Sequence, residues 1–501
     1  MNEAMSLDYL GLFRLVIPET IVVIAALVVL AADGLAMRDL DRRFRFIICA
    51  MITSVGCLAA TGWMLIMPSE ANVFDGMLVL NPMIQLVKGA LLLLTILTAL
   101  ISVEGSFTEH VGEYLALVLL ALVGMMFLVS TEDILMIFIS LELTSLSLYI
   151  LTAFNKCNIK SAEAALKYFL FGGMAAAFTL FGLSLLYGLS GATNLNQIAA
   201  AVRGPKLDPL LIVAIVTSVI GFGFKVAAVP FHLWAPDAYE GAPTPSAAFI
   251  ASGSKVAGFF IFAKVMFLGF AGAEGSGAWK AFHPGWVPVL AAVAMASMVL
   301  GNLAAIVQGS VRRLLAYSAI AHAGYMLLGI IAGGQGFPSL LYYVFTYALT
   351  TLGAFGVVTV VQESSGGDSF ADFAGLSRRA PVAAFSMMVF MLSLAGIPPL
   401  AGFFGKFYVF AAALASGSKS LGLLWLVALA IAMSAVSLYY YLKVLKHIYV
   451  VETPATEGGR GVTVLSQVVL ALIALAVVVL GCAPNLIVGR LVTVMKVAGA
   501  N

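Results

Sequence analysis

The stretch GFGFKVAAVPFHLWAPD, residues 221–237, places Lys225 among two glycines and two prolines inside a long apolar run. A proline lacks the backbone donor and frees the carbonyl one turn before it. In hydrocarbon, such free backbone groups are tolerated only where protein or a water-filled cavity satisfies them. A second stretch of this kind, LAGIPPLAGFFGKFYVF at 394–410, places Lys406 after two prolines. These two stretches predict two discontinuous membrane helices.

The composition places the whole chain among membrane proteins with many spans. Of 501 residues, 62% are apolar and 10% are charged, against roughly 25% charged residues in soluble domains. A spanning helix needs about 20 apolar residues, and the chain holds about 14 such segments. We therefore expect an all-α protein, with helices 7 and 12 discontinuous, whose spans lie near 10–32, 44–67, 79–103, 114–130, 132–154, 163–188, 209–226, 245–268, 286–308, 312–332, 338–361, 382–414, 421–449 and 462–482.

Four ionisable side chains lie deep inside these apolar runs: Glu142, Lys225, Lys255 and Lys406. A charge at the bilayer centre costs ~2.5–3.5 kcal/mol on insertion scales, so such residues normally line a polar path or bind something. They are too far from the ends of their spans to snorkel to the interface. We predict that they move charge across the membrane; structural ion pairing between helices is the alternative.

The chain also shows a weak internal repeat. Lys225 and Lys406 are 181 residues apart, and Glu142 and His322 are 180 apart. Discontinuous helices in both halves of a transporter indicate inverted repeats around a site near the membrane midplane. We predict two inverted five-helix repeats, spans 4–8 and 9–13. The expected divisions are 1–113 for three N-terminal helices, 114–268 and 286–449 for the repeats, and 450–501 for the last helix.

The cysteines and glycines indicate which chemistry lies elsewhere. Cys49, Cys57, Cys157 and Cys482 lie in or at the ends of spans and form no CxxC pair, so their spacing cannot supply an iron–sulfur cluster or a zinc site. Neither a GxGxxG nor a GxxxxGK[ST] motif occurs. Redox or nucleotide chemistry must therefore be carried by another polypeptide.

The charge distribution predicts the orientation in the membrane. The N-terminal residues MNEAMSLDYLGLF are acidic, whereas the n-region of a secretory signal is basic, so we expect no cleavable signal peptide. Lysines and arginines are about twice as frequent beside the loops after odd-numbered spans as beside the others, and the positive-inside rule then places both termini outside the cytoplasm.

The longer stretch GFGFKVAAVPFHLWAPDAYEGAPTPSAAFIASGSKVAGF, residues 221–259, resembles the proton-pumping antiporter-like subunits of respiratory complex I. The resemblance covers nearly the whole chain and is closest to the NADH-quinone oxidoreductase subunit N family. Subunit M-like chains carry a glutamate where Lys406 stands, and subunit L-like chains add a long lateral helix at the C-terminus. The motifs YEGAPTP and SKVAGF are similar to those of subunit N, with Ser246 where valine is expected.

This resemblance implies a proton-translocating subunit of NADH:quinone oxidoreductase, a translocase, in a bacterial plasma membrane. Its partners would be other subunits of the membrane arm and membrane lipid, with no nucleic acid. NADH, FMN, iron–sulfur clusters and quinone would be bound in the complex, and this chain would hold no cofactor. The nearest alternative is a subunit of a multisubunit Na⁺/H⁺ antiporter. Two further alternatives are a stand-alone solute carrier and a structural spacer within a complex.

The resemblance also implies roles for individual residues. Glu142 would keep Lys225 protonated, protons would pass through Lys255 and His322, and Lys406 would exchange them with the opposite side. Lys167 matches the family's lysine in the sixth span, although it lies close enough to a helix end to snorkel. His232 could relay protons, because the reference pKa of histidine is near 6.5, or it could be a packing residue.

Other polar residues receive simpler interpretations. Lys264 lies near the end of its span and is expected to snorkel, whereas Lys88 and Glu19 lie deeper, and for them both interpretations stay open. The aromatic run YYYLKVL at 439–445 is interpreted as helix packing and an interfacial belt.

Overall fold

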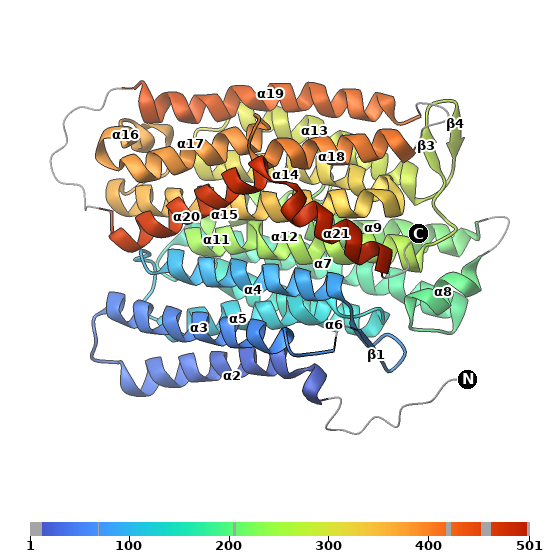
Figure 1. The fold of residues 1–501 in the computed structure, drawn as a ribbon, viewed down its shortest axis with the longest axis horizontal. Coiled ribbons are helices and arrows are strands. Elements are labelled where there is room, and N and C mark those ends of the chain that lie inside the picture. Colours follow the sequence, from blue (N-terminus) through green and yellow to red (C-terminus); the bar gives the residue numbers. More distant parts are fainter. Residues whose placement is uncertain (1–12, 69, 204–206, 417–421, 452–461, 498–501) are drawn as a thin grey trace.

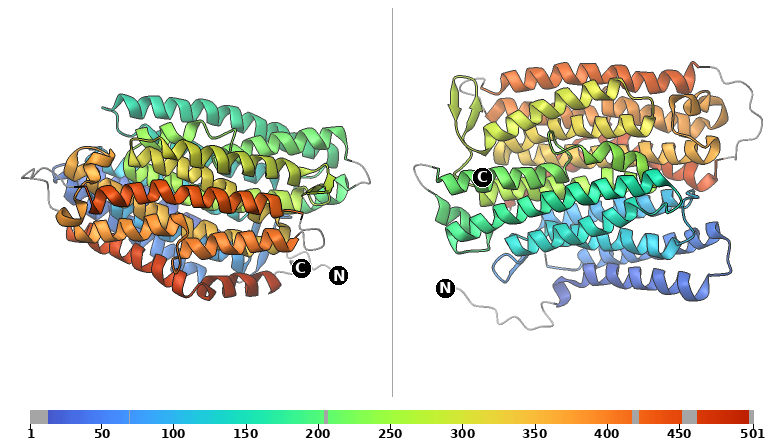
Figure 2. Two further views of the ribbon diagram at one scale, coloured as in Figure 1. Left: turned by 90° about the horizontal axis from the view of Figure 1, so that it is seen from above. Right: turned by 180° about the vertical axis from the view of Figure 1, so that it is seen from behind.

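A computed structural model of the chain describes residues 13–68, 70–203, 207–416, 422–451 and 462–497. Residues 10–12, where the first expected span begins, lie outside these ranges. The described helices run side by side along the long axis, from α2 (Ile17–Ala31) at one edge to α19 (Leu424–Tyr449) at the other (Figure 1). The views from above and behind place α7 (Ile159–Ser190) and the last two helices on opposite faces (Figure 2).

The chain begins with three membrane helices. A π-helical turn, η1 (Ala32–Ala36), extends α2, and α3 (Arg42–Met64) and α4 (Pro82–Ser102) follow. A short antiparallel hairpin, β1 (Ala71–Val73) with β2 (Leu78–Leu80), joins α3 to α4. Side chains that accept from backbone amides at the start of a helix satisfy its free donors, and Asp41 and Asn81 do so for α3 and α4.

The next part contains the first discontinuous helix. Asp133, Asn158, Asn194 and Asp208 cap the N-termini of four of its helices. Its elements besides α7 are α5 (Val111–Val129), α6 (Ile134–Thr152), α8 (Leu195–Val202), α9 (Pro209–Lys225), α10 (Trp234–Gly241), α11 (Thr244–Ala251), α12 (Gly253–Lys264) and the π-helical turn η2 (Val265–Gly269).

The second discontinuous helix lies in the part that follows. A hairpin precedes it, and two helices come after α19 at the end of the described chain. The elements are β3 (Ser276–Ala278), β4 (Ala281–His283), α13 (Trp286–Ile306), α14 (Val311–Ile331), η3 (Gly333–Gly336), α15 (Phe337–Ser365), η4 (Phe370–Phe373), α16 (Leu376–Arg379), α17 (Pro381–Ala395), α18 (Ala401–Ser416), α20 (Val464–Cys482) and α21 (Asn485–Val497).

The expected all-α membrane fold is confirmed. Within the described ranges, 12 helices are long and apolar enough to cross a membrane. The expected spans 7 and 12 are the two discontinuous ones: span 7 is divided into α9 and α10, and span 12 into α17 and α18. Together these account for the about 14 spans that segment length predicts.

Two details were not expected. The eighth span, expected at 245–268, is the segment Thr244–Gly269, and a turn at Ser252, whose hydroxyl bonds to the Ala248 carbonyl at 2.7 Å, divides it into α11 and α12. A serine that bonds back to a carbonyl one turn earlier often bends a helix. The fourteenth span is followed by the unexpected helix α21, which starts directly after Pro484 because proline interrupts a helix.

Two isolated β-bridges mirror one another and support the proposed repeat. Asp133 pairs with Asn194, and Ser310 pairs with Ser369. The first bridge joins the N-caps of α6 and α8, and the second joins those of α14 and η4. Because α8 and α16 lie at opposite ends of the molecule (Figure 1), the two bridges also lie at opposite ends. We propose that residues 114–268 and 286–449 are inverted repeats.

The most buried helices lie in the centre. The segment Thr244–Gly269, which contains α11 and α12, has its most apolar stretch wholly buried, and α14 and α15 are almost as enclosed. In α2, α3, α7 and α19, by contrast, only about a third of the residues in the most apolar stretch are buried, as in helices that face lipid or a partner.

Candidate functional site

Lys225 lies in the last turn of α9, directly before the first helix break. Its Nζ donates a hydrogen bond to the Ser145 hydroxyl on α6 at 3.0 Å, and its side chain is buried. Glu142 is half-buried one turn earlier on α6. Within the described ranges, no ion pair within 4.0 Å joins it to Lys225. The direct partner of the Lys225 ammonium is therefore the Ser145 hydroxyl.

Protein groups satisfy the free backbone around this break. The indole of Trp234 donates to the Phe224 carbonyl at 3.0 Å, and the amide of Val229 donates to the Ser297 hydroxyl at 2.9 Å. Free backbone at membrane depth is tolerated on this condition. Trp234 and Ser297 are the side chains that allow α9 to end inside the membrane.

Lys255 lies in the first turn of α12, directly after the Ser252 interruption. Its Nζ donates to the Ala319 carbonyl of α14 at 2.5 Å and lies 5.3 Å from the ring centroid of Tyr347. Cations within about 6 Å of an aromatic ring are attracted to its face. A methyl group added at Gly258, one turn further, would lie 3.4 Å from the Lys225 side chain, so Lys225 packs against the helix that carries Lys255.

His322 lies between two tyrosine hydroxyls in the buried centre. Its Nδ1 is 2.7 Å from the Tyr343 hydroxyl, and its Nε2 is 3.1 Å from the Tyr441 hydroxyl. A neutral imidazole carries one donor and one acceptor nitrogen, so it can bond to both hydroxyls at once. The expected interfacial role is wrong for Tyr440 and Tyr441, which are buried and bond to Asn302 and His322.

Lys406 lies in α18, directly after the second break. Its Nζ donates to the Leu394 and Ala395 carbonyls at 2.9 and 3.1 Å and to the Ser434 hydroxyl at 2.8 Å. These carbonyls belong to the last turn of α17, where a cation is favoured. Lys225 thus precedes its break, whereas Lys406 follows its own.

Aromatic rings link three of these groups into one row. The Tyr347 ring lies beside both Lys255 and His322, with its centroid 4.9 Å from the imidazole centroid. The Tyr325 ring lies beside His322 at 5.7 Å and beside Lys406 at 5.2 Å. We call Lys255, His322 and Lys406 the central row; Lys225 adjoins it across α12.

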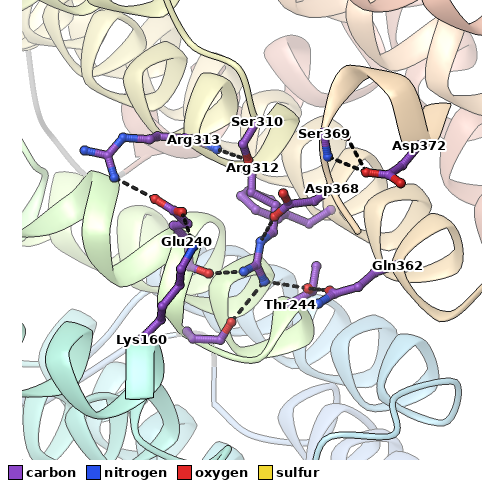
Figure 3. A network of polar contacts seen from close by, with 12 residues as sticks. Lys160, Glu240, Thr244, Ser310, Arg312, Arg313, Gln362, Asp368, Ser369 and Asp372 are labelled. Atoms are coloured by element: carbon purple, nitrogen blue, oxygen red, sulfur yellow. Dashed lines mark hydrogen bonds and ion pairs between the residues drawn. The ribbon is translucent and has the colours of Figure 1, made fainter. Parts of the chain in front are cut away.

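The structure does not bring Lys167 and His232 into the central row. Lys167 is partly exposed and pairs with Glu163 at 2.7 Å and Asp237 at 2.8 Å. Asp237 also pairs with Arg313, which together with Glu240 and Lys160 extends this ion network at the α16 end of the molecule (Figure 3). His232 is buried in the break itself, and its Nδ1 has no partner among the described residues.

Two further pairs correct or complete the expectations. Lys264 was expected to snorkel, but it is buried and pairs with Glu132 at 3.2 Å. Lys88 and Glu19 bind each other at 2.6 Å, and both side chains are almost fully buried between α4 and α2. These lysines hold helices together rather than line the central row.

Comparison with known proteins first gives the class of this fold and site. Residues 131–434 match the family described as "NADH:quinone oxidoreductase/Mrp antiporter, TM". A chain of the Mrp complex from Dietzia has the same fold at 20% identity, with a TM-score of 0.78 over 95% of this chain and 96% of that one. The protein is thus an antiporter-like membrane protein with multiple spans.

Closer relatives give the family. NADH-quinone oxidoreductase subunit N 2 of Acidobacterium capsulatum is 53% identical, covering 96% of this chain and 98% of the relative. A chain of respiratory complex I from Thermus thermophilus is 32% identical with a TM-score of 0.78, covering 95% and 99%. The chain belongs to the NADH-quinone oxidoreductase subunit N family.

Proposed function

We propose that this chain is a proton-translocating membrane-arm subunit of NADH:quinone oxidoreductase, coupling electron transfer from NADH to quinone with proton movement. Family membership supports its place in the complex. The observation that carries the proton role is the central row together with the adjoining Lys225. Three titratable groups, Lys255, His322 and Lys406, follow one another through the buried helices and share aromatic neighbours.

The contacts of this row suit groups that gain and lose protons. Lys255 and Lys406 donate only to neutral carbonyl and hydroxyl oxygens among the described residues, so losing a proton leaves no carboxylate unpaired in the interior. His322 can accept a proton at one nitrogen and release it from the other. The rings hold the cations in place, and hydroxyls and bridging water carry the protons between them.

The redox groups are proposed to lie in partner subunits. Among the described residues no three His, Cys, Asp or Glu gather as metal ligands. Membership of the subunit N family supports this placement: NADH, FMN, iron–sulfur clusters and quinone would be bound elsewhere in the complex, and this chain would contact other membrane-arm subunits and lipid. Quinone reduction would act on the central row through charge displacement along the membrane arm.

The location is proposed to be the bacterial inner membrane, with both termini outside the cytoplasm. The described chain begins at α2 and ends at α21 at the same end of the molecule, opposite α16 (Figure 1). Arg312, Arg313, Arg378 and Arg379 lie near α16, and the positive-inside rule assigns such an end to the cytoplasm.

The test compares Lys225→Ala with Lys280→Ala, a substitution in the exposed turn of the β3–β4 hairpin. Vesicles that hold equal amounts of assembled complex are supplied with NADH, and internal acidification is measured. We expect Lys225→Ala to lose most of its pumping and Lys280→Ala to pump normally. Normal pumping by Lys225→Ala would refute the proposal.

The second, less supported candidate is a subunit of a Na⁺/H⁺ antiporter, because the description of the matching family names Mrp antiporters as well. Purification of a tagged chain from native membranes separates the two. Redox subunits should accompany it in one case and cation-antiporter subunits in the other.

A further inference from the structure

Arg312, at the start of α14, is buried and binds four groups from outside its own helix (Figure 3). Its Nε donates to the Asp368 carboxylate at 2.7 Å, and its Nη1 donates to the Thr244 hydroxyl at 2.8 Å and the Ala242 carbonyl at 3.1 Å. Its Nη2 donates to the Glu240 carbonyl. One guanidinium thus joins the second proposed repeat to the first.

The groups from the first repeat all belong to the corner between α10 and α11. Glu240 and Ala242 lie at the C-terminal end of α10, and Thr244 begins α11. The last carbonyls of a helix have no partner within it, and a cation there is favoured. Arg312 satisfies these carbonyls from the partner repeat. The Thr244 hydroxyl also donates to Gln362 of α15.

Helix α14 contacts the first repeat on both sides of the Ser252 interruption. Arg312 binds the start of α11, and Ala319, two turns further along α14, accepts the hydrogen bond of Lys255 in the first turn of α12. Helix α11, which also packs against α15 and α4, therefore connects the corner bound by Arg312 to the turn that carries Lys255. A shift of the corner would change where Lys255 meets the Ala319 carbonyl.

We propose that Arg312 is a positioning residue, which holds the α10–α11 corner of the first repeat in the place that sets the contact between Lys255 and Ala319. This proposal rests on the proposed function, because it assigns a purpose to the Lys255 contact. Arginine presents its donors in a rigid planar fork, whereas lysine is a single flexible point charge. Only the fork can bind Asp368, the corner carbonyls and Thr244 at the same time.

The experiment compares Arg312→Gln and Arg312→Lys with Arg379→Gln in the assembled complex. Arg379 also binds carbonyls at this end, those of Asp372 and Ala374, but these belong to its own loop. We measure protons moved per NADH oxidised and hydrogen exchange of the backbone over residues 242–252. Altered coupling contacts change equilibria by about two-fold or more, so we expect both Arg312 variants to lose about half of the proton ratio and to exchange faster. Arg379→Gln should match the wild type in both measurements.

A normal proton ratio or unchanged exchange in Arg312→Gln would overturn the proposal. If that variant does not assemble, Thr244→Val removes one acceptor without removing the charge, and it should show the same two changes to a smaller degree. A normal ratio in Thr244→Val would then count against the proposal.

Lys255→Ala separates this result from a failure of the proposed function. If Lys255→Ala pumps normally, the proton role of the row is wrong, and so is the purpose given to Arg312. If Lys255→Ala loses pumping while Arg312→Gln keeps it, only the positioning role is wrong.

Discussion

The ammonium nitrogen of Lys225 lies 3.0 Å from the hydroxyl oxygen of Ser145. Ser145 follows Glu142 by three residues on the same helix, so the hydroxyl lies between the lysine and the turn that carries the carboxylate. A hydroxyl can donate and accept at the same time. The Ser145 hydroxyl accepts from Lys225 and donates to the Leu141 carbonyl at 2.6 Å, so it holds the ammonium group against the helix that carries Glu142; the sequence pattern does not single it out.

The first prediction concerns the Ser145 hydroxyl. Ser145→Ala removes the hydroxyl, leaving Lys225 buried without its described acceptor, whereas Ser145→Thr keeps an oxygen in place. We expect Ser145→Ala to slow NADH-driven acidification of vesicles and Ser145→Thr to retain most of it. Equal rates in the two variants would show that the hydroxyl has no part in transfer.

The second prediction concerns the charge of Glu142. Glu142→Gln keeps the shape of the side chain and removes the anion, and Glu142→Asp keeps the anion on a shorter side chain. If the anion favours the protonated form of Lys225, pumping should be impaired in Glu142→Gln and partly retained in Glu142→Asp. Proton flux is measured at equal complex content, and identical behaviour of the two variants would show that shape matters rather than charge.

The third prediction concerns Lys406. Arginine supplies a fixed positive charge to the Leu394 and Ala395 carbonyls but keeps its proton at physiological pH. We therefore expect Lys406→Arg to assemble and to pump poorly, with slower NADH oxidation where coupling is tight. Parallel assays of oxidation and acidification provide the readout. Near-normal pumping would mean that Lys406 only holds a charge in place.

The fourth prediction concerns the centre of the row. His322→Phe keeps a ring among Tyr325, Tyr343 and Tyr347 but removes both nitrogens that meet hydroxyls. Pumping should fall sharply in assembled complex. Tyr408→Phe, which changes a tyrosine hydroxyl outside the row, is the control and should behave as the wild type. A normal proton ratio in His322→Phe would remove the histidine from the path.

The fifth prediction concerns packing at the second break. A methyl group at Gly481 of α20 would lie 2.0 Å from the Pro399 carbonyl oxygen and 2.6 Å from the Ala401 amide nitrogen. These are backbone atoms that cannot rotate away, so Gly481→Ala should lower stability by ~1–3 kcal/mol, the usual cost of overpacking. Thermal unfolding of the purified complex gives the measurement. Gly173→Ala, where the methyl group meets open space, should not lower it.

Sequence alone predicted the helices well because their signal is local. Apolar length and proline position located α9 and α17 within a few residues, and buried charges located Lys225, Lys255 and Lys406 in the interior. The break at Ser252 was missed because serine and glycine interrupt a helix only in some tertiary settings. Ser145, Tyr343 and Tyr441 were missed because their roles depend on partners from other helices.

The repeat illustrates the same limit. The spacing of ionisable residues along the sequence pairs Glu142 with His322, which are 180 residues apart. The mirrored bridges give a different register, because Ser310 follows Asp133 by 177 residues. In that register His322 corresponds to Ser145 and Ala319 to Glu142, so the hydroxyl that accepts from Lys225 and the carbonyl that accepts from Lys255 lie one turn apart, at positions of α6 and α14 that do not match. The N-cap residues indicate this register, whereas apolar helices resemble one another too closely to be aligned by sequence.

The close packing of Gly481 against the backbone at the second break separates this backbone from lipid. Helix α20 packs against α17 and α18, and it also contacts α4 among the N-terminal helices. A lipid tail approaching from that face meets the apolar surface of α20 instead of the open backbone at 396–400. Without this cover, the free backbone groups beside Lys406 would face hydrocarbon, which offers them no hydrogen-bond partner.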